Sequence, residues 1–280
     1  MKKWLMLLAV AMLLVACGTP PTEDAATPTS TEPRVLRVMT YGSFDIGEEV
    51  VAQFEDAHDV TLQFLDAGDT GQMVSQAILS KDNPQADVLY GIDNTFLSRA
   101  LEAGIFLPYE SQNLDAVPDD LVLDPEHRVT PVDYGDVCLN YDRAYFEEHE
   151  VPVPQRLEDL SDPAYAGLLI VENPASSSPG LAFLLTTIST FGEEGYLDYW
   201  EQLRQNDVLV VDSWDTAYYG EFRAGNRPLV VSYATSPAAE VYFAEVSRVE
   251  APTGAIGAPG TGSGSTRPAG RSPFIAKIHS

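Results

Sequence analysis

The first hundred residues alternate short apolar runs with segments of helical periodicity, and this pattern constrains the fold more than any other feature. Apolar runs with the length of buried strands occur at 34–41, 60–65 and 86–91. Segments with apolar residues at helical spacing follow them at 48–57, 72–80 and 94–104. Strands and helices that alternate in this way form a mostly parallel sheet with helices on both faces. The sequence therefore predicts an α/β fold.

The stretch 207–237 repeats this unit and carries the strongest sign of a ligand site. Two short apolar runs flank a helical segment over about 215–224, and Gly225 is a typical helix stop. Trp214 and Tyr233 each follow one of the runs. Ligands of open α/β sheets bind beyond the carboxyl ends of the strands, so both rings are candidate contacts. Packing of the two rings against a core is the alternative.

The middle of the chain is expected to contain two further helices and a crossing. Ser178 has the residue type of an N-cap and Pro179 that of a first helical position, which predicts a long apolar helix over 181–191. Another helix is predicted over 196–205. The alternating segment 131–142 is a candidate strand that carries the chain from one lobe to another.

The amino terminus has the features of an export signal. Two lysines precede an apolar run from Trp4 to Val15, which is too short for a spanning helix. The run ends in Leu-Val-Ala-Cys17, which resembles the bacterial lipobox, so we expect residues 1–16 to be a lipoprotein signal peptide and Cys17 the lipid attachment site. An internal cysteine in an ordinary signal is the alternative. Residues 17–34, rich in Thr, Pro, Ala and Glu, are expected to form a disordered tether.

The charge balance narrows the class of partner. The chain has 42 acidic and 16 basic residues, a formal net charge of −26. Such a charge argues against nucleic acid and anionic lipid surfaces and favours encounter with a cation. A solvated acidic surface or a saline habitat explains it equally. Only Cys138 remains after Cys17, so no disulfide is expected within the exported chain.

Motifs for catalysis or for a bound cofactor are not found. The four histidines are scattered, no phosphate-loop lysine motif is present, and no serine lies in a Gly-x-Ser-x-Gly elbow. Cys138 is the one candidate nucleophile, but a small cysteine on an apolar strand is more often part of a core. We therefore expect neither an enzyme nor a metal or cofactor site.

Aromatic and acidic residues in the predicted loops suggest a particular kind of ligand. Rings attract a planar cation and carboxylates accept hydrogen bonds from its amino group, a combination offered by Tyr41, Trp214, Tyr218 and Tyr233 with Asp69, Asp93 and Asp133. Ser176 to Ser178 at a helix start are able to bind an anion or a hydroxyl, and a purely local cap is the alternative.

These motifs together resemble those of the thiamine-binding proteins of bacterial ABC transporters, which belong to the two-lobed, type II-like periplasmic binding protein class. The resemblance extends over roughly residues 35–254. It rests on Thr40-Tyr-Gly-Ser-Phe44, Ala86-Asp-Val-Leu-Tyr-Gly-Ile-Asp-Asn94, Asp133-Tyr-Gly135, Asn173-Pro-Ala-Ser-Ser-Ser-Pro-Gly-Leu181, Trp214 with Ala217-Tyr218, and Ser232-Tyr-Ala-Thr-Ser-Pro237.

The resemblance implies a function and a set of contacts. Tyr41 and Asp69 from the first lobe, and Ser177, Trp214 and Tyr233 from the second, would contact thiamine or its phosphates. The lobes would cover 35–132 and 133–236, with a return segment over 237–280. The implied protein is extracytoplasmic, lipid-anchored and monomeric. It would close on its ligand by a hinge motion and deliver it to an ABC permease and ATPase.

Two departures from the family keep alternatives open. Ala238 and Ala239 stand where some relatives have an aromatic residue, so one stacking wall is expected to be thinner or supplied by Tyr242. From about residue 255 the chain has a Gly-rich, linker-like composition where the family continues, which suggests a truncation or a frameshift near Gly257. The alternatives are a binding protein for another ligand such as ferric ion, a thiamine-degrading transferase with Cys138 beside a base, and a nonfunctional fragment.

Overall fold

The structure is a computed structural model that describes residues 34–244, 246, 249–256 and 274–277, the last four by their backbone alone. The predicted signal peptide 1–16, Cys17 and the tether up to Pro33 lie outside the described residues, as do Gly257 and most of the Gly-rich tail.

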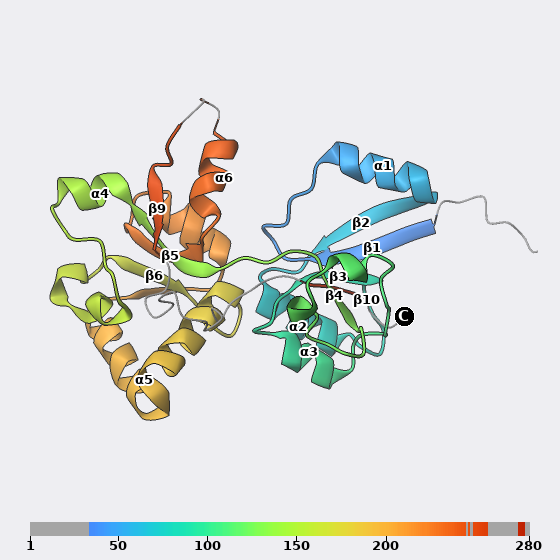
Figure 1. The fold of residues 1–280 in the computed structure, drawn as a ribbon, viewed down its shortest axis with the longest axis horizontal. Coiled ribbons are helices and arrows are strands. Elements are labelled where there is room, and N and C mark those ends of the chain that lie inside the picture. The colour runs from blue at the N-terminus through green and yellow to red at the C-terminus, as the bar shows by residue number, and fades with distance from the viewer. Residues whose placement is uncertain (1–33, 245, 247–248, 257–273, 278–280) are drawn as a thin grey trace, which may run out of the picture. The chain divides into compact units, whose positions relative to one another are not determined.

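The first sheet contains the three strands predicted at the start of the chain. β1 (Arg34–Thr40) runs parallel to both β2 (Val60–Asp66) and β3 (Val88–Ile92). β10 (Phe274–Lys277) is antiparallel to β3 and to β4 (Val129–Pro131). The strand order is therefore β2-β1-β3-β10-β4 (Figure 1).

Helices join these strands as the alternating pattern predicts. They are α1 (Glu48–His58), α2 (Thr70–Leu79) and α3 (Leu97–Ala103), and two 3₁₀ turns follow at Leu114–Ala116 and Asp119–Leu121. Met73 and Val74 of α2 pack with Met39 and Leu89 of the sheet in the first core. By contrast, α1 has no buried residue. The first lobe therefore depends on α2 and α3 for its core.

The second sheet is built from the later strands of the chain. They are β5 (Val137–Asp142), β6 (Leu169–Glu172), β7 (Leu209–Val211), β8 (Leu229–Tyr233) and β9 (Thr253–Ile256). β6 is parallel to β7 and β8, whereas β5 is antiparallel to β8 and β9. The order is β7-β6-β8-β5-β9.

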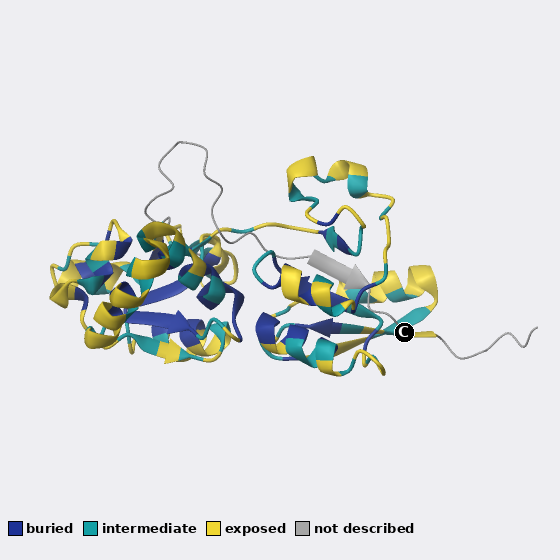
Figure 2. Ribbon diagram, turned by 90° about the horizontal axis from the view of Figure 1, so that it is seen from below, coloured by how far each residue is buried: buried dark blue, intermediate teal, exposed yellow. Residues whose placement is uncertain are grey.

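Both faces of the second sheet are covered. Leu229 and Val231 of β8 point into a core with Tyr199 and Leu203, while the intervening Val230 packs in another cluster. Its helices and turns are α4 (Arg143–Glu148), 3₁₀ segments η3 (Leu157–Ser161) and η4 (Pro163–Tyr165), α5 (Ser178–Gln205), the π-helix η5 (Thr216–Phe222) and α6 (Ser236–Tyr242). Figure 2 shows the buried strands of this lobe in dark blue.

Three local features differ from the sequence-based expectations. α5 is one helical element bent at Gly192, whose φ of 73° and ψ of 171° are not helical, and it includes both helices predicted over 181–205. The bend can be followed in Figure 1. Ser177, not Ser178, occupies the N-cap position of α5. The predicted strand 131–142 is divided, since Pro131 ends β4 in the first sheet and Val137 begins β5 in the second.

The predicted return segment 237–280 contributes one strand to each of the two sheets. β9 pairs with β5 in the second sheet, whereas β10, within the Gly-rich tail, pairs with β3 and β4 in the first. The chain therefore adds a strand to each sheet after Pro237.

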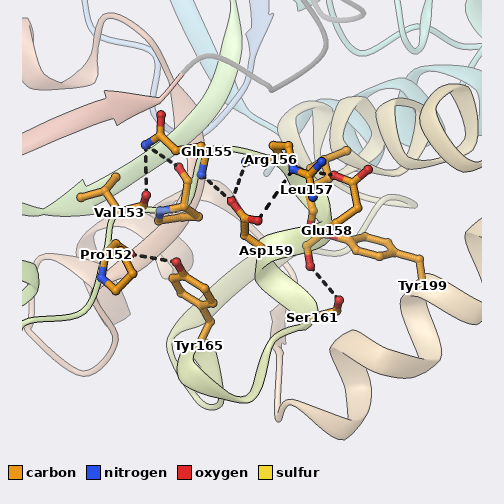
Figure 3. A network of polar contacts seen from close by, with 11 residues as sticks. Pro152, Val153, Gln155, Arg156, Leu157, Glu158, Asp159, Ser161, Tyr165 and Tyr199 are labelled. Atoms are coloured by element: carbon orange, nitrogen blue, oxygen red, sulfur yellow. Dashed lines mark hydrogen bonds and ion pairs between the residues drawn. The ribbon is translucent and has the colours of Figure 1, made fainter.

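A polar network holds the connection between α4 and β6 against α5 (Figure 3). The Tyr165 hydroxyl donates to the Pro152 carbonyl at 2.8 Å, and the Tyr199 hydroxyl to the Leu157 carbonyl at 2.7 Å. The Asp159 carboxylate accepts from the backbone N–H of Gln155 at 2.7 Å. Carbonyls of this irregular segment thereby gain partners that a sheet or helix would otherwise supply.

Candidate ligand-binding site

A pocket of about 480 Å³ lies where several strands of the two sheets end. Its walls come from the segments after β1 and β2, from the 132–136 connection, and from the ends of β7 and β8. The lining residues are Tyr41, Ser43, Asp69, Thr70, Gly91, Asp133, Tyr134, Gly135, Trp214, Tyr233, Thr235 and Ala239. This set contains two carboxylates and no lysine, arginine or histidine. The pocket therefore suits an uncharged or cationic ligand with a planar surface.

Four of the five predicted contacts lie in this pocket: Tyr41, Asp69, Trp214 and Tyr233. Ser177 is not part of its lining, because its side chain is fully buried at the start of α5. The Ser177 hydroxyl has no hydrogen-bond partner of good geometry among the described residues, although it is close enough to Asp69 to lower the pKa of that carboxyl.

Asp69 connects the first sheet to the second. Its carboxylate accepts from the Thr70 backbone N–H at 2.9 Å as the N-cap of α2, and from the Trp214 backbone N–H at 3.0 Å. Beside it, the Gly71 N–H donates to the Ser176 carbonyl at 2.7 Å. Burial raises the pKa of the Asp69 carboxyl, and the bonds from Trp214 and Thr70, together with the nearby Ser177 hydroxyl, oppose that rise. Asp69 therefore has a structural role besides any contact with a ligand.

Trp214 is held in place by neighbours outside the pocket. Its indole Nε1–H donates to Ser232 Oγ at 2.9 Å, and its ring stacks on Tyr218 at a centroid distance of 4.9 Å. Tyr218 itself is buried and donates its hydroxyl to Glu240 at 2.6 Å. Of the aromatic set predicted to face a cation, Tyr218 thus supports Trp214 and does not line the pocket. The Tyr233 ring lies 6.2 Å from that of Trp214.

Tyr41 packs in the first lobe against a glycine and a second tyrosine. Its ring stacks on Tyr90 at 6.2 Å and 24°. A Cβ on Gly91 would lie 2.1 Å from Tyr41 Cδ1, and Gly91 has a φ of 110°. The glycine after Tyr90 is therefore required both by the backbone conformation and by the position of the Tyr41 ring.

Of the two other acids predicted to face a cation, Asp93 has a structural role and Asp133 lines the pocket. Asp93 is buried and accepts from Thr95 Oγ1 at 2.7 Å and from the Phe96 N–H at 3.3 Å, so it caps the turn before α3. Asp133 does line the pocket. Burial raises the pKa of its carboxyl to about 6, against a hydrogen bond from Tyr90 that lowers it. Asp133, Ser43 and Thr235 each lie within a motif that carried the resemblance, whereas Thr70 had no such sequence signal.

Two further expectations concern Cys138 and Tyr242. Cys138 is buried on β5 and does not line the pocket, and burial raises the pKa of its thiol to about 12. Its sulfur receives only the Asn140 amide at 3.4 Å among its described hydrogen bonds. A thiolate nucleophile is therefore not supported. Tyr242 is 82% exposed and does not line the pocket, so it does not replace the aromatic residue that some relatives have at this place. The pocket is lined there by Ala239.

The described part of the chain shows neither a metal-binding cluster nor a membrane-spanning helix. Among the described residues, no three His, Cys, Asp or Glu side chains are grouped so that they can hold a metal ion. No helix in the described ranges has the length and apolar character needed to cross a bilayer.

Residues 83–261 match the family described as bacterial extracellular solute-binding proteins. The chain is 28% identical over 221 residues to the thiamine-binding periplasmic protein of Brucella melitensis, which covers 77% of this chain and 64% of that relative. It is 31% identical to the thiamine-binding periplasmic protein of Escherichia coli over 73% of this chain and 61% of that relative. The chain therefore spans less than two thirds of the length of these relatives.

Among solved structures, a periplasmic thiamin binding protein is similar to this chain with a TM-score of 0.71 and 26% identity, over 87% of this chain and 72% of the other. The predicted two-lobed, type II-like α/β fold is thereby confirmed.

Proposed function

Because the chain belongs to the bacterial extracellular solute-binding protein family, we propose that it captures thiamine, or a thiamine phosphate, outside the cytoplasm. It then delivers the ligand to a membrane permease and its ATPase for import. The names of the similar proteins from Brucella melitensis and Escherichia coli support thiamine as the ligand.

The composition of the pocket is the observation that carries the proposal. Thiamine joins a planar aminopyrimidine to a positively charged thiazolium ring. Tyr41, Trp214 and Tyr233 offer ring faces, and Asp69 and Asp133 offer carboxylates. Rings and carboxylates stabilise a desolvated planar cation, whereas a basic side chain would repel it. Ser177 is buried, but it belongs to the proposed site because its hydroxyl lowers the pKa of the Asp69 carboxyl.

Closure of the lobes would complete the site. The Asp69 carboxylate and the Gly71 N–H, both from the first lobe, bond to the Trp214 N–H and the Ser176 carbonyl of the second. Contacts of this kind form only when the two lobes approach one another, so they favour a closed, ligand-holding state. We include the lipid anchor at Cys17 and a monomeric state in the proposal. The anchor would keep the protein at the membrane beside its permease.

Other ligands and activities are less well supported. A ferric ion needs converging oxygen or imidazole ligands, and the pocket offers two carboxylates among aromatic rings. A thiamine-degrading transferase needs a thiolate in the pocket, whereas Cys138 is buried elsewhere with a pKa raised by burial. The similar proteins are named as binding proteins, and binding without catalysis is accordingly part of the proposal.

Tryptophan fluorescence tests the proposal on the purified chain. Thiamine, its phosphates and ferric ion are titrated into wild type, Trp214→Ala and the control Tyr242→Ala, whose ring is exposed and outside the pocket. We expect saturable quenching by thiamine or a phosphate in wild type and in the control. Binding to Trp214→Ala is followed by calorimetry, because this variant lacks the tryptophan at the pocket, and it should be at least tenfold weaker.

Several results would refute parts of the proposal. A folded wild-type protein that ignores all thiamine compounds would refute the ligand, and a response to ferric ion alone would favour the metal. A circular dichroism spectrum typical of an unfolded chain would support the alternative that the chain is a nonfunctional fragment.

A further inference from the structure

The two carboxylates of the pocket differ in what they are free to bind. Both oxygens of Asp69 already accept backbone N–H groups, from Thr70 and from Trp214. The Asp133 carboxylate accepts one hydrogen bond, from the Tyr90 hydroxyl, which offsets part of the rise in its pKa, and no cationic side chain among the described residues lowers that pKa. A carboxylate has about four acceptor positions. Asp133 therefore retains most of its capacity for a ligand, and Asp69 does not.

The surroundings of Asp133 also favour a cation in the ligand. Tyr90, which bonds Asp133, stacks on Tyr41, and Tyr41 lines the same pocket. The carboxylate thus stands beside aromatic rings whose faces attract positive charge. Among the residues that the structure describes, no lysine, arginine or histidine lines the pocket to neutralise it. An unneutralised carboxylate in a pocket lined by aromatic rings suits a ligand that carries a quaternary nitrogen.

We propose that Asp133 is the counter-charge for the quaternary nitrogen of the ligand, that Tyr90 is its positioning residue, and that protonation of Asp133 weakens the binding of the cation. This inference rests on the proposed function and assigns to Asp133 a role in selecting charged over uncharged rings.

The direction of the pH dependence follows from the charges that face Asp133. Although Asp133 keeps an exposed surface, partial burial of its carboxyl raises the pKa to about 6 in the free protein, and a bound cation would lower that pKa. Affinity is then constant well above pH 6 and decreases as the pH falls below it. Burial raises the pKa of both Tyr90 and Tyr41, so the two rings stay neutral throughout. The pKa of Asp69 is also raised by burial, so an Asp133 variant is needed to separate the two carboxylates.

Calorimetric titration with two ligands tests the proposal on the whole purified chain. One ligand is thiamine, and the other is an analogue whose thiazolium is replaced by an uncharged aromatic ring of the same shape. We expect Asp133→Asn to weaken thiamine binding about 10-fold to 100-fold at pH 8, the effect of a lost charge-assisted bond. The neutral analogue should change less than about threefold. Asp136→Asn, which removes another exposed acid of the same connection that does not line the pocket, is the matched control.

A pH series separates a counter-charge from a structural role. Wild-type affinity for thiamine should fall by about tenfold per pH unit below pH 6, while the ratio of wild-type to Asp133→Asn affinity falls toward one. Titration of the ligand's own pyrimidine is common to both proteins and cancels in that ratio. Tyr90→Phe should move the midpoint to higher pH, because it removes the bond that lowers the Asp133 pKa.

The outcomes are distinguishable. Equal weakening of both ligands, or none, in Asp133→Asn would overturn the counter-charge while leaving the proposed function intact. A folded wild type that binds neither ligand would refute the proposed function and, with it, the role of Asp133.

Discussion

Gly71, in the first turn of α2, offers a sharp test of how the two lobes meet at the pocket. Its N–H donates to the Ser176 carbonyl at 2.7 Å. A Cβ at this position would lie 2.5 Å from the Ala175 carbonyl oxygen and 2.8 Å from that of Ser176. Both atoms belong to the backbone and cannot rotate aside. Gly71→Ala therefore forces α2 away from the loop that precedes α5.

The size of the effect follows from these distances. Ordinary contact begins at 3.4 Å, so the loop must retreat by roughly 0.9 Å from the oxygen that is now 2.5 Å away. This displacement breaks the Gly71 to Ser176 bond, worth about 1 kcal/mol, and weakens the charge-assisted bond from Trp214 to Asp69, worth about 1.5–3 kcal/mol. A closed state less stable by about 2–4 kcal/mol binds ligand about 30-fold to 700-fold more weakly.

The assay compares thiamine affinity with the stability of the free protein. Alanine is favoured over glycine in a helix by about 1 kcal/mol, and the Phe96 ring, 2.8 Å from the added Cβ, is a side chain that can move. The midpoint of thermal unfolding without ligand should therefore change little. Gly220→Ala, where a Cβ meets nothing closer than 3.8 Å, is the control. Wild-type affinity in Gly71→Ala, or a loss explained by unfolding of the free protein, would refute the reasoning.

Three other substitutions test separate parts of the structure. Tyr199→Phe removes the bond to the buried Leu157 carbonyl and should lower the free energy of unfolding in urea by about 1–3 kcal/mol without changing ligand affinity; unchanged stability would contradict the network in Figure 3. Gly91→Ala should displace the Tyr41 ring and weaken thiamine binding, and retained affinity would show that this ring is not a contact. Glu172 is fully buried with both oxygens unpartnered among the described residues, and burial raises its pKa well above the usual value. The stability that its protonated form supports is complete below the unfolded-state pKa and is lost as the pH rises, so Glu172→Gln should raise the melting temperature at pH 8 and leave it unchanged at pH 4.

The local pattern of the sequence predicted most strands and helices because burial and periodicity agree there. β1 to β3 and the helices between them repeat the apolar spacing of their segments. The bend at Gly192 was not visible, because glycine in a helical pattern is compatible with either one helix or two. β10 was missed for a different reason: its strand follows a Gly-rich stretch, and its pairing with β3 and β4 depends on residues more than a hundred positions away.

The motifs named residues of the candidate site, but they did not show how the side chains of those residues are oriented. Tyr41, Asp69, Trp214 and Tyr233, four of the contacts named by the resemblance, line one pocket, and their contact with a ligand stays a prediction. Ser177 is the fifth residue named by the resemblance, yet its side chain is fully buried beside Asp69, since a residue at a helix N-cap is oriented by the helix and not by a ligand.

The support roles at the site also depended on packing. The Tyr218 hydroxyl donates a hydrogen bond to the Glu240 carboxylate, and its ring therefore stacks on Trp214 on the side away from the pocket. The spacing of residues in the sequence does not show how the side chains of Ser177 and Tyr218 are oriented. Such roles become visible only when the helices are packed against the sheets.

Isothermal titration of the purified chain with thiamine at pH 8 tests the central claim most directly. The pocket predicts saturable one-to-one binding, with heat that Asp69→Asn and Trp214→Ala diminish and that Tyr242→Ala leaves unchanged. A chain that is folded by circular dichroism and gives no heat of binding with thiamine or its phosphates would contradict the claim.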